Sequence, residues 1–181
     1  REAISTARHS IRIINPYFTL CPHLKRALKE AVARGVDVQV MVSEKSDIPI
    51  TPRIVEYNVN KLMRAGVKVY FYQGGFHHSK IMMIDSIYSF IGSANLNSRS
   101  LSFDYECNLL IADAPTTHQL ISLFDRDRDE HSFLLTPERW KQLPKWNKFK
   151  GWLFHFLTPF VDAQKRRQGI PGMIIIDRLY A

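Results

Sequence analysis

The chain has 181 residues, of which 45% are hydrophobic and 23% are charged, and these proportions exclude a disordered chain, a collagen-like chain and a simple coiled coil. Its length suits one α/β domain with a substantial core and is too short for two large domains. Lys and Arg outnumber Asp and Glu by 25 to 17, a net charge of +8, which suggests an anionic partner such as lipid phosphate, nucleic acid or an acidic substrate.

The first part of the chain alternates between strand-like and helix-like segments. Strands are predicted over residues 11–14, 36–42 and 67–72, where β-branched and apolar residues predominate. Helices are predicted over residues 22–34 and 52–65, because each segment opens on a proline and is followed by a glycine. This β-α-β-α-β order predicts an α/β sandwich with a largely parallel early sheet.

The next part of the chain completes the predicted domain, which we expect to cover residues 1–135. Further strands are predicted over residues 79–84, 88–93 and 105–112, the first two joined tightly through Asp85-Ser86, and a helix over residues 116–133. Acidic and basic residues alternate at positions 125–130 of that helix. Such a run is typical of a solvated helix face, and we prefer that interpretation to a metal site.

Residues 76–85 carry the most informative chemistry. On a strand, side chains alternate between faces, so His78 and Lys80 point the same way. An imidazole beside an ammonium group predicts a shared anion, with Lys80 neutralising phosphate oxygens while His78 attacks phosphorus or moves a proton. The alternative is a solvated strand face. The preceding His77 is assigned no role.

Two later segments supply groups that suit the same anion. Ser93 and Asn95 share a face, and their hydroxyl and amide groups can bind phosphate oxygens, while Gly92 permits close backbone approach. Glu106 lies in the predicted strand 105–112. A carboxylate there can hold one imidazole nitrogen and leave the other free to react.

The pattern His78-x-Lys80-x4-Asp85 followed by Gly92-Ser93-x-Asn95 resembles the HKD motif of the phospholipase D superfamily. Over residues 1–160, the chain looks like the second half of bacterial cardiolipin synthases, on the segments Asn15-Pro16-Tyr17-Phe18, Arg34-Gly35-Val36-Asp37-Val38, Ser46-Asp47 and Asn97-x-Arg99-Ser100.

This resemblance implies a phospholipase D-type α/β sandwich that forms a phosphohistidine without a metal or another cofactor. It implies the catalytic set His78, Lys80, Asp85 and Glu106, with His78 as nucleophile or general acid and Glu106 orienting it. Lys80, Ser93 and Asn95 form the implied phosphate-binding set. We expect Asp85, which completes the motif, to support the structure by pairing with a nearby base rather than by touching substrate.

Family members build one active site from two HKD motifs, and this sequence carries one good copy. His23-Leu24-Lys25 imitates the spacing, but it falls in a predicted helix, where the two basic side chains diverge to nearly opposite sides. We therefore expect a second HKD half as partner. A missing N-terminal part of the same polypeptide, which the start at Arg1 favours, and a homodimer mate are the two possibilities.

The composition changes after residue 135. Residues 136–167 carry eight Lys or Arg against two Asp or Glu, a net charge of +6. Residues 136–162 are expected to form an amphipathic aromatic and basic helix. Its proposed membrane contacts are Trp146, Phe149, Trp152 and Phe156. A membrane-interface helix is favoured over a core-packed stripe and over a surface for single-stranded nucleic acid. Residues 163–181 form a tail that matches nothing.

The resemblance and the tail together predict a phosphatidyltransferase that joins two phosphatidylglycerol molecules into cardiolipin plus glycerol. We expect it to act on phosphatidylglycerol or another anionic phospholipid, as a peripheral protein on the cytoplasmic side of a bacterial inner membrane. The alternatives are a phospholipase D-family phosphodiesterase acting on DNA or RNA and a catalytically silent lipid-binding half. Because the charge surplus is concentrated with tryptophans, lipid is preferred to nucleic acid.

Overall fold

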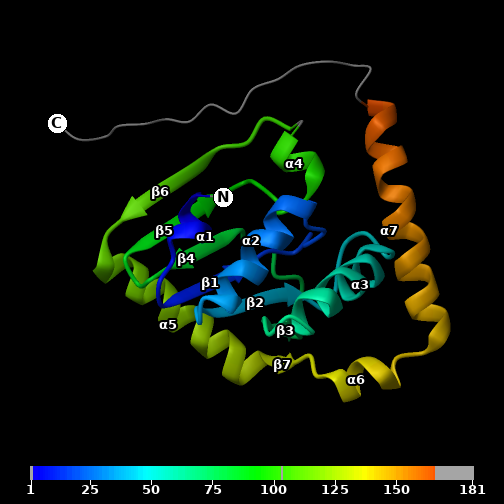
Figure 1. The fold of residues 1–181 in the computed structure, drawn as a ribbon, viewed down its shortest axis with the longest axis horizontal. Helices are drawn as coiled ribbons and strands as arrows, with labels where there is room; N and C mark the ends of the chain where they lie inside the picture. Colours follow the sequence, from blue (N-terminus) through cyan, green and yellow to red (C-terminus); the bar gives the residue numbers. More distant parts are fainter. Residues whose placement is uncertain (1, 103, 166–181) are drawn as a thin grey trace.

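A computed structural model describes residues 2–102 and 104–165 of the chain. Its strands form one sheet in the order β6-β5-β4-β1-β2-β3-β7 (Figure 1). The strands are β1 (Ser10–Ile14), β2 (Asp37–Ser43), β3 (Lys68–Tyr72), β4 (Ile81–Ile84), β5 (Tyr88–Gly92), β6 (Asn108–Ala112) and β7 (Ser132–Leu134). The helices are α1 (Glu2–Thr6), α2 (Pro22–Ala33), α3 (Thr51–Met63), α4 (Ser98–Ser102), α5 (Ala114–His131), α6 (Pro137–Gln142) and α7 (Lys145–Lys165).

The predicted α/β sandwich is confirmed, including its parallel early sheet. Strands β1, β2 and β3 are parallel neighbours, joined by the crossover helices α2 and α3. Strand β4 then pairs antiparallel with β1, and β5 and β6 extend the sheet in antiparallel fashion. At the other edge, the short strand β7 pairs antiparallel with β3, an addition that the sequence analysis does not predict.

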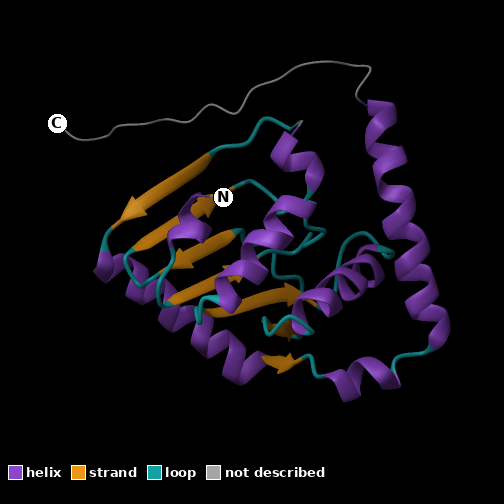
Figure 2. Cartoon of the chain, viewed as in Figure 1, coloured by secondary structure: helices purple, strands orange, loops and turns teal. Residues whose placement is uncertain are grey.

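Alternating side chains of the sheet supply two apolar layers. One layer is the larger core, in which Ile11, Ile13, Val38, Val40 and Val42 pack with buried residues of α2 and α3. The other layer lies under α5, which crosses the opposite face of the sheet (Figure 2). There Phe124 of α5 is fully buried against Ile14, Met41 and Met83. Because successive side chains of a strand point to opposite faces of the sheet, the same strands supply apolar residues to both layers.

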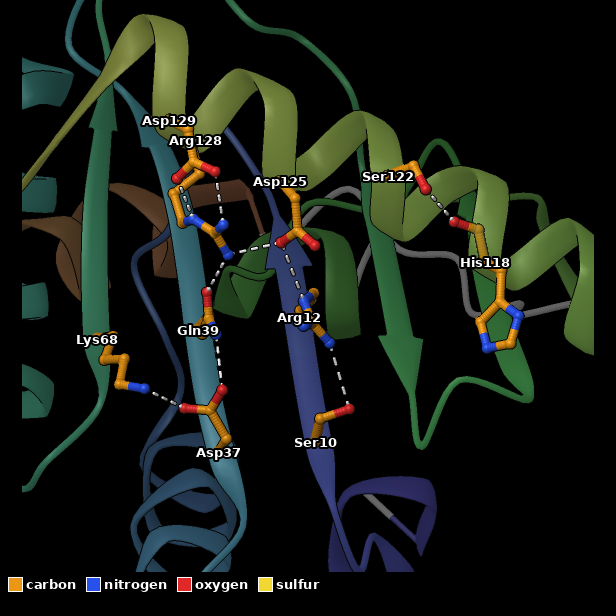
Figure 3. Close-up of polar contacts among 10 residues, drawn as sticks. All are labelled: Ser10, Arg12, Asp37, Gln39, Lys68, His118, Ser122, Asp125, Arg128 and Asp129. Carbon is orange, nitrogen blue, oxygen red and sulfur yellow. Dashed lines mark hydrogen bonds and ion pairs between the residues drawn. The ribbon is translucent and has the colours of Figure 1, made fainter.

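The alternating charges of α5 are not simply a solvated face. Arg128 holds Asp125 at 2.6 Å and reaches Gln39 of β2 at 3.4 Å, and Arg12 of β1 lies 3.6 Å from Asp125 (Figure 3). Asp125 and Arg128 contribute a polar layer between α5 and the sheet, whereas Arg126, Asp129 and Glu130 are exposed, as predicted for a solvated face. Among the described residues, no group of three His, Cys, Asp or Glu side chains is arranged to hold a metal ion.

Helix α7 lies against α3 along one side of the molecule (Figure 1). The contact is close at Gly151, where a Cβ atom would lie 2.4 Å from the carbonyl oxygen of Arg53. Nearby, the His155 ring packs on the Tyr57 ring, with the centroids 5.2 Å apart. The Nδ1 atom of His155 lies 3.3 Å from the side-chain nitrogen Nδ2 of Asn58. These contacts fix which face of α7 is turned towards the domain.

Another part of the α7 surface carries a row of exposed aromatic rings, which we call the aromatic ladder: Trp146, Phe149, Trp152 and Phe156. Successive ring centroids are 5.4, 5.8 and 6.4 Å apart. These four rings are not packed into the core of the described domain. In the described segments, no helix is both long enough and apolar enough to cross a membrane.

The predicted tail, residues 163–181, contributes only its first three residues to α7, and the others lie outside the described residues.

Candidate active site

A cavity of about 460 Å³ lies where the loop before β4 meets the end of β5. Its lining residues are His78, Ser79, Lys80, Ile81, Ile91, Gly92, Ser93 and Asn95. The antiparallel register explains this meeting, because Ile81 opens β4 directly opposite Ile91 near the end of β5. Four residues predicted from the sequence, His78, Lys80, Ser93 and Asn95, thus line one cavity. Nothing in the cavity lining is acidic, which suits an anionic ligand.

His78 lies in the loop before β4, beside two aromatic rings that also contact each other. The ring centroid of Phe76 is 5.1 Å from that of His78, and the ring of Tyr17 meets it edge-on at 5.9 Å. The Tyr17 hydroxyl donates a hydrogen bond to the Asp47 carboxylate. Burial and this hydrogen bond raise the pKa of Tyr17 to about 12. Tyr17 is therefore a neutral wall beside the imidazole at physiological pH.

Lys80 folds back over the same loop, since its Nζ donates to the carbonyl oxygen of His78 at 2.7 Å. Burial lowers the pKa of Lys80, although the carboxylates of Glu106 and Asp47 oppose the shift. The only hydrogen bond of this ammonium group among the described side chains and backbone is to a neutral acceptor. An anionic ligand would be a stronger partner for this ammonium group, because a hydrogen bond between two ions is stronger than one to a neutral acceptor.

Ser93 and Glu106 contact each other, which differs from the predicted arrangement. The Ser93 hydroxyl donates to the Glu106 carboxylate and accepts from the backbone N–H of Cys107 at 3.0 Å. The structure thus gives Glu106 a bond to Ser93 rather than to His78. Strand β6 begins at Asn108 and not at residue 105, so Glu106 belongs to the loop that runs alongside Ser93.

Asn95 presents an orphaned polar atom beside the cavity. Its Oδ1 is buried and has no hydrogen-bond partner among the residues that the structure describes. Buried polar groups are nearly always bonded, so this amide is suited to a ligand. Asn15, itself buried, holds the surrounding loop by donating from Nδ2 to the carbonyl oxygen of Ala94 and accepting from the N–H of Leu96.

Gly92 permits a close approach, but of a neighbouring strand. A Cβ atom at this position would lie 2.3 Å from the carbonyl oxygen of Cys107 and 2.7 Å from Cα of Asn108. The glycine is therefore required by the packing of β5 against the start of β6, which brings Ser93 and Glu106 together. The expectation that its small size serves ligand approach directly is not supported by this contact.

Asp85 lies at the opposite end of β4 from His78 and does not line the cavity. Its carboxylate accepts hydrogen bonds from the backbone N–H groups of Arg8, His9 and Ser10 at 2.8, 2.7 and 3.0 Å. Partial burial favours its neutral form, but these three donors hold the pKa of Asp85 below its ordinary value. Its position supports the expected structural role, with backbone amides instead of a basic side chain as partners.

The second His-x-Lys pair does not form a comparable site. His23 is exposed on α2, and Lys25 turns towards α3, where its Nζ lies 3.4 Å from Oδ1 of Asn58. The helical prediction for this segment is confirmed. Among the described residues, His78 and Lys80 are therefore the His-x-Lys pair that lines the cavity.

The roles of three residues in the site region are not predicted from the sequence: Tyr17, Asn15 and His77. Tyr17 and Asn15 follow β1 directly, and Asp47 follows β2. Because β1 and β2 are parallel, their carboxyl ends meet at one edge of the sheet, where sites are common. This rule could have drawn attention to Tyr17 and Asn15. The contacts of His77 are formed with α5 and could not be read from local sequence.

Comparison with known proteins gives consistent matches. A family model described as cardiolipin synthase, PLD-like domain, matches residues 1–128. Cardiolipin synthase 1 of Staphylococcus epidermidis is 39% identical over 160 residues, which are 88% of this chain and 32% of that protein. The chain therefore spans about a third of the length of this curated relative.

Solved structures share the fold. Nuc, a phospholipase D family member from Salmonella typhimurium, matches with a TM-score of 0.65 and 22% identity, covering 74% of this chain and 86% of that chain. The phosphatidylserine synthase of Haemophilus influenzae Rd KW20 matches with a TM-score of 0.69 and 17% identity, covering 90% and 42%. At these identities the likeness concerns the architecture.

Proposed function

The chain belongs to the family of cardiolipin synthase phospholipase D-like domains, and on this premise we propose that its parent protein is a phosphatidyltransferase that converts two phosphatidylglycerol molecules into cardiolipin and glycerol. The observation that carries the proposal is that His78, Lys80, Ser93 and Asn95 line one and the same cavity. An imidazole can act as the nucleophile of phosphoryl transfer through a covalent intermediate, and a cation with two neutral hydrogen-bonding groups can stabilise the charge on phosphate.

The reaction proceeds in two steps through phosphatidyl-histidine. An imidazole nitrogen attacks the phosphorus of one phosphatidylglycerol, and the bond from phosphorus to the head-group glycerol oxygen breaks. That oxygen takes a proton and glycerol leaves. A hydroxyl group of the second phosphatidylglycerol then gives up its proton and attacks the same phosphorus. The phosphorus–nitrogen bond breaks, which releases cardiolipin and the free histidine.

The other side chains of the cavity bind and orient the phosphate group. Lys80 and the Nδ2 group of Asn95 donate to the non-bridging phosphate oxygens. The buried Oδ1 of Asn95, an acceptor without a partner among the described residues, suits a ligand group that donates a hydrogen bond, such as a head-group hydroxyl. Ser93 lines the pocket, with its hydroxyl oriented by Glu106. Asp47 and Glu106 near Lys80 limit the positive potential of the site, so a phosphodiester rather than a more highly charged anion is its expected ligand.

A second HKD half completes the site. The chemistry needs one group to attack and another to protonate the departing glycerol, and the described cavity offers one imidazole. His78 takes one of these roles, and the histidine of the second half takes the other. That half belongs to the longer parent polypeptide, in keeping with relatives about three times as long as this chain, or to a second copy.

The aromatic ladder of α7 is the proposed membrane contact. Trp146 and Phe156 are 61% and 59% exposed, and indole rings beside basic residues are typical of helices lying in the membrane interface. Lys150 lies over the Trp146 ring at 5.4 Å, so positive charge accompanies the rings. We expect peripheral attachment to anionic lipid on the cytoplasmic side of a bacterial inner membrane. A dry, membrane-apposed site would favour a lipid hydroxyl over water as acceptor.

The test uses the full-length parent protein with phosphatidylglycerol vesicles and, separately, with single-stranded and double-stranded DNA. Mass spectrometry of the lipids should detect cardiolipin in the first mixture, and the DNA should stay intact. Phosphatidic acid as the sole lipid product would assign water as acceptor and refute the synthase proposal. DNA cleavage with untouched lipid would replace it with a nuclease. Vesicle binding with no product of any kind would indicate a silent lipid-binding protein.

A further inference from the structure

The two adjacent histidines before β4 have different surroundings. His78 lines the cavity, whereas His77 does not. The His77 ring lies between two secondary elements on the other side of the loop. Its Nε2 is 3.3 Å from Oδ2 of Asp127 on α5, and both side chains are only 16% exposed. The ring of Tyr72, at the end of β3, meets it edge-on with centroids 4.8 Å apart.

The backbone of the same loop is tied to β2. The N–H of His77 donates to Oγ of Ser43 at 3.1 Å, and that hydroxyl donates to the carbonyl oxygen of Gly75 at 3.1 Å. Strand β4 begins only at Ile81, so the loop does not share the regular ladder at this point. His77 therefore contacts β2, β3 and α5, and these contacts fix the segment that carries His78.

We propose that the pair His77–Asp127 positions His78, an inference that rests on the function proposed above. Side chains of successive residues in an extended segment diverge. Anchoring the ring of His77 against α5 consequently directs the ring of His78 into the cavity, beside Tyr17 and Phe76. Asp127 is a positioning residue and not a catalytic one, because it contacts His77 and lies away from the cavity lining.

This arrangement predicts a particular kinetic defect. A displacement of about 1 Å in a reacting group reduces rate by roughly a hundredfold. Replacing His77 with Leu removes the hydrogen bond to Asp127, so we expect kcat for cardiolipin formation to fall by about tenfold to a hundredfold. The KM for phosphatidylglycerol should change by no more than about threefold, since Ser93 and Asn95 lie on a separate segment and keep their places.

Conservative replacement separates positioning from bulk packing. His77→Gln places an amide donor within reach of the Asp127 carboxylate, and it should retain most of the kcat that His77→Leu loses. Asp127→Ala should resemble His77→Leu, and the double variant should be no worse than either single variant, since each removes the same contact. His118→Leu, on the exposed part of α5, is the matched control and should behave as wild type (Figure 3).

A readout that is independent of the substrate accompanies the kinetics. Amide hydrogen exchange over residues 75–80 of the full-length protein should be about tenfold or more faster in His77→Leu and Asp127→Ala than in wild type and His118→Leu, because the loop opens locally. His77→Gln should restore protection. Unchanged exchange in both disruptive variants would overturn the positioning inference whatever lipid the enzyme uses. A wild type that makes no cardiolipin but shows this exchange pattern would refute the proposed function and leave the pair's role supported.

Discussion

Asp85→Asn separates a structural motif residue from a catalytic one. Asp85 and Ser86 turn the chain between β4 and β5 with φ angles of 51° and 59°, values that most side chains avoid and that Asn tolerates well. The substitution therefore keeps the turn conformation. It removes the negative charge and replaces one acceptor oxygen with an NH2 group, which cannot accept the backbone hydrogen bonds that the carboxylate accepts.

The expected loss of stability follows from those bonds. Three backbone donors converge on Asp85, and a hydrogen bond contributes about 0.5–1.5 kcal/mol net. Because water can reach this edge and replace part of the interaction, we expect a loss of about 2 kcal/mol. For a domain of this size, that corresponds to a decrease in Tm of roughly 4–8 °C. Below the transition, kcat should stay within about twofold of wild type, since Asp85 lies at the far end of β4 from His78.

The effect should also depend on pH. The three backbone donors lower the pKa of Asp85 in the folded protein despite the opposing effect of burial. Its stabilisation is therefore fully present above the ordinary value of 3.8 and is lost as the pH falls through the lower folded pKa. The difference in Tm between wild type and Asp85→Asn should be largest near neutral pH and shrink below about pH 4.

Differential scanning fluorimetry of the full-length protein, with cardiolipin synthesis measured at a permissive temperature, provides the assay. Ser86→Asn is the matched control in the same turn, and its Tm should equal or slightly exceed that of wild type. The reasoning would be refuted by an unchanged Tm accompanied by a loss of kcat beyond tenfold, because Asp85 would then act in the chemical step.

Two further predictions concern the cavity wall and the membrane surface. Gly92→Ala should lower stability by about 1–3 kcal/mol and reduce transfer activity, because its Cβ would meet the backbone of Cys107; a Tm within 1 °C of wild type would contradict the packing argument. The double variant Trp146→Ser/Trp152→Ser should lose about 2 kcal/mol of binding to phosphatidylglycerol vesicles, or roughly thirtyfold in affinity, without a lower Tm. Vesicle sedimentation would test this against Leu123→Ser, an exposed apolar substitution on α5, and equal binding by both proteins would remove the aromatic ladder as the contact.

Much of the fold follows from local patterns. Helices α2 and α3 are predictable because each has a proline in its first turn, ends near a glycine and turns an apolar stripe towards the sheet. The cavity residues His78 and Ser93 are also predictable, because the two antiparallel strands that carry their segments are adjacent in sequence. Local periodicity and a short connection suffice for both inferences.

Other features depend on contacts between distant segments. Glu106 has a carboxylate suited to hold an imidazole, yet the pairing of β5 with β6 puts it beside Ser93. The alternating charges of α5 match a solvated face in sequence, but the buried Phe124 turns part of that run towards the sheet. Likewise, an aromatic stripe has the same spacing in a core as at an interface. The close contact of Gly151 with α3 determines which face of α7 is turned towards the domain, and this contact could not be read from the spacing.

The most direct test of the account is cardiolipin synthesis by the full-length parent protein in three forms: wild type, His78→Ala and His23→Ala. Each is mixed with phosphatidylglycerol vesicles, and the lipids are identified by mass spectrometry. We predict cardiolipin and glycerol from wild type and from His23→Ala, whose histidine is exposed on α2, and no cardiolipin from folded His78→Ala. Undiminished synthesis by His78→Ala would contradict the assignment of this cavity as the active site.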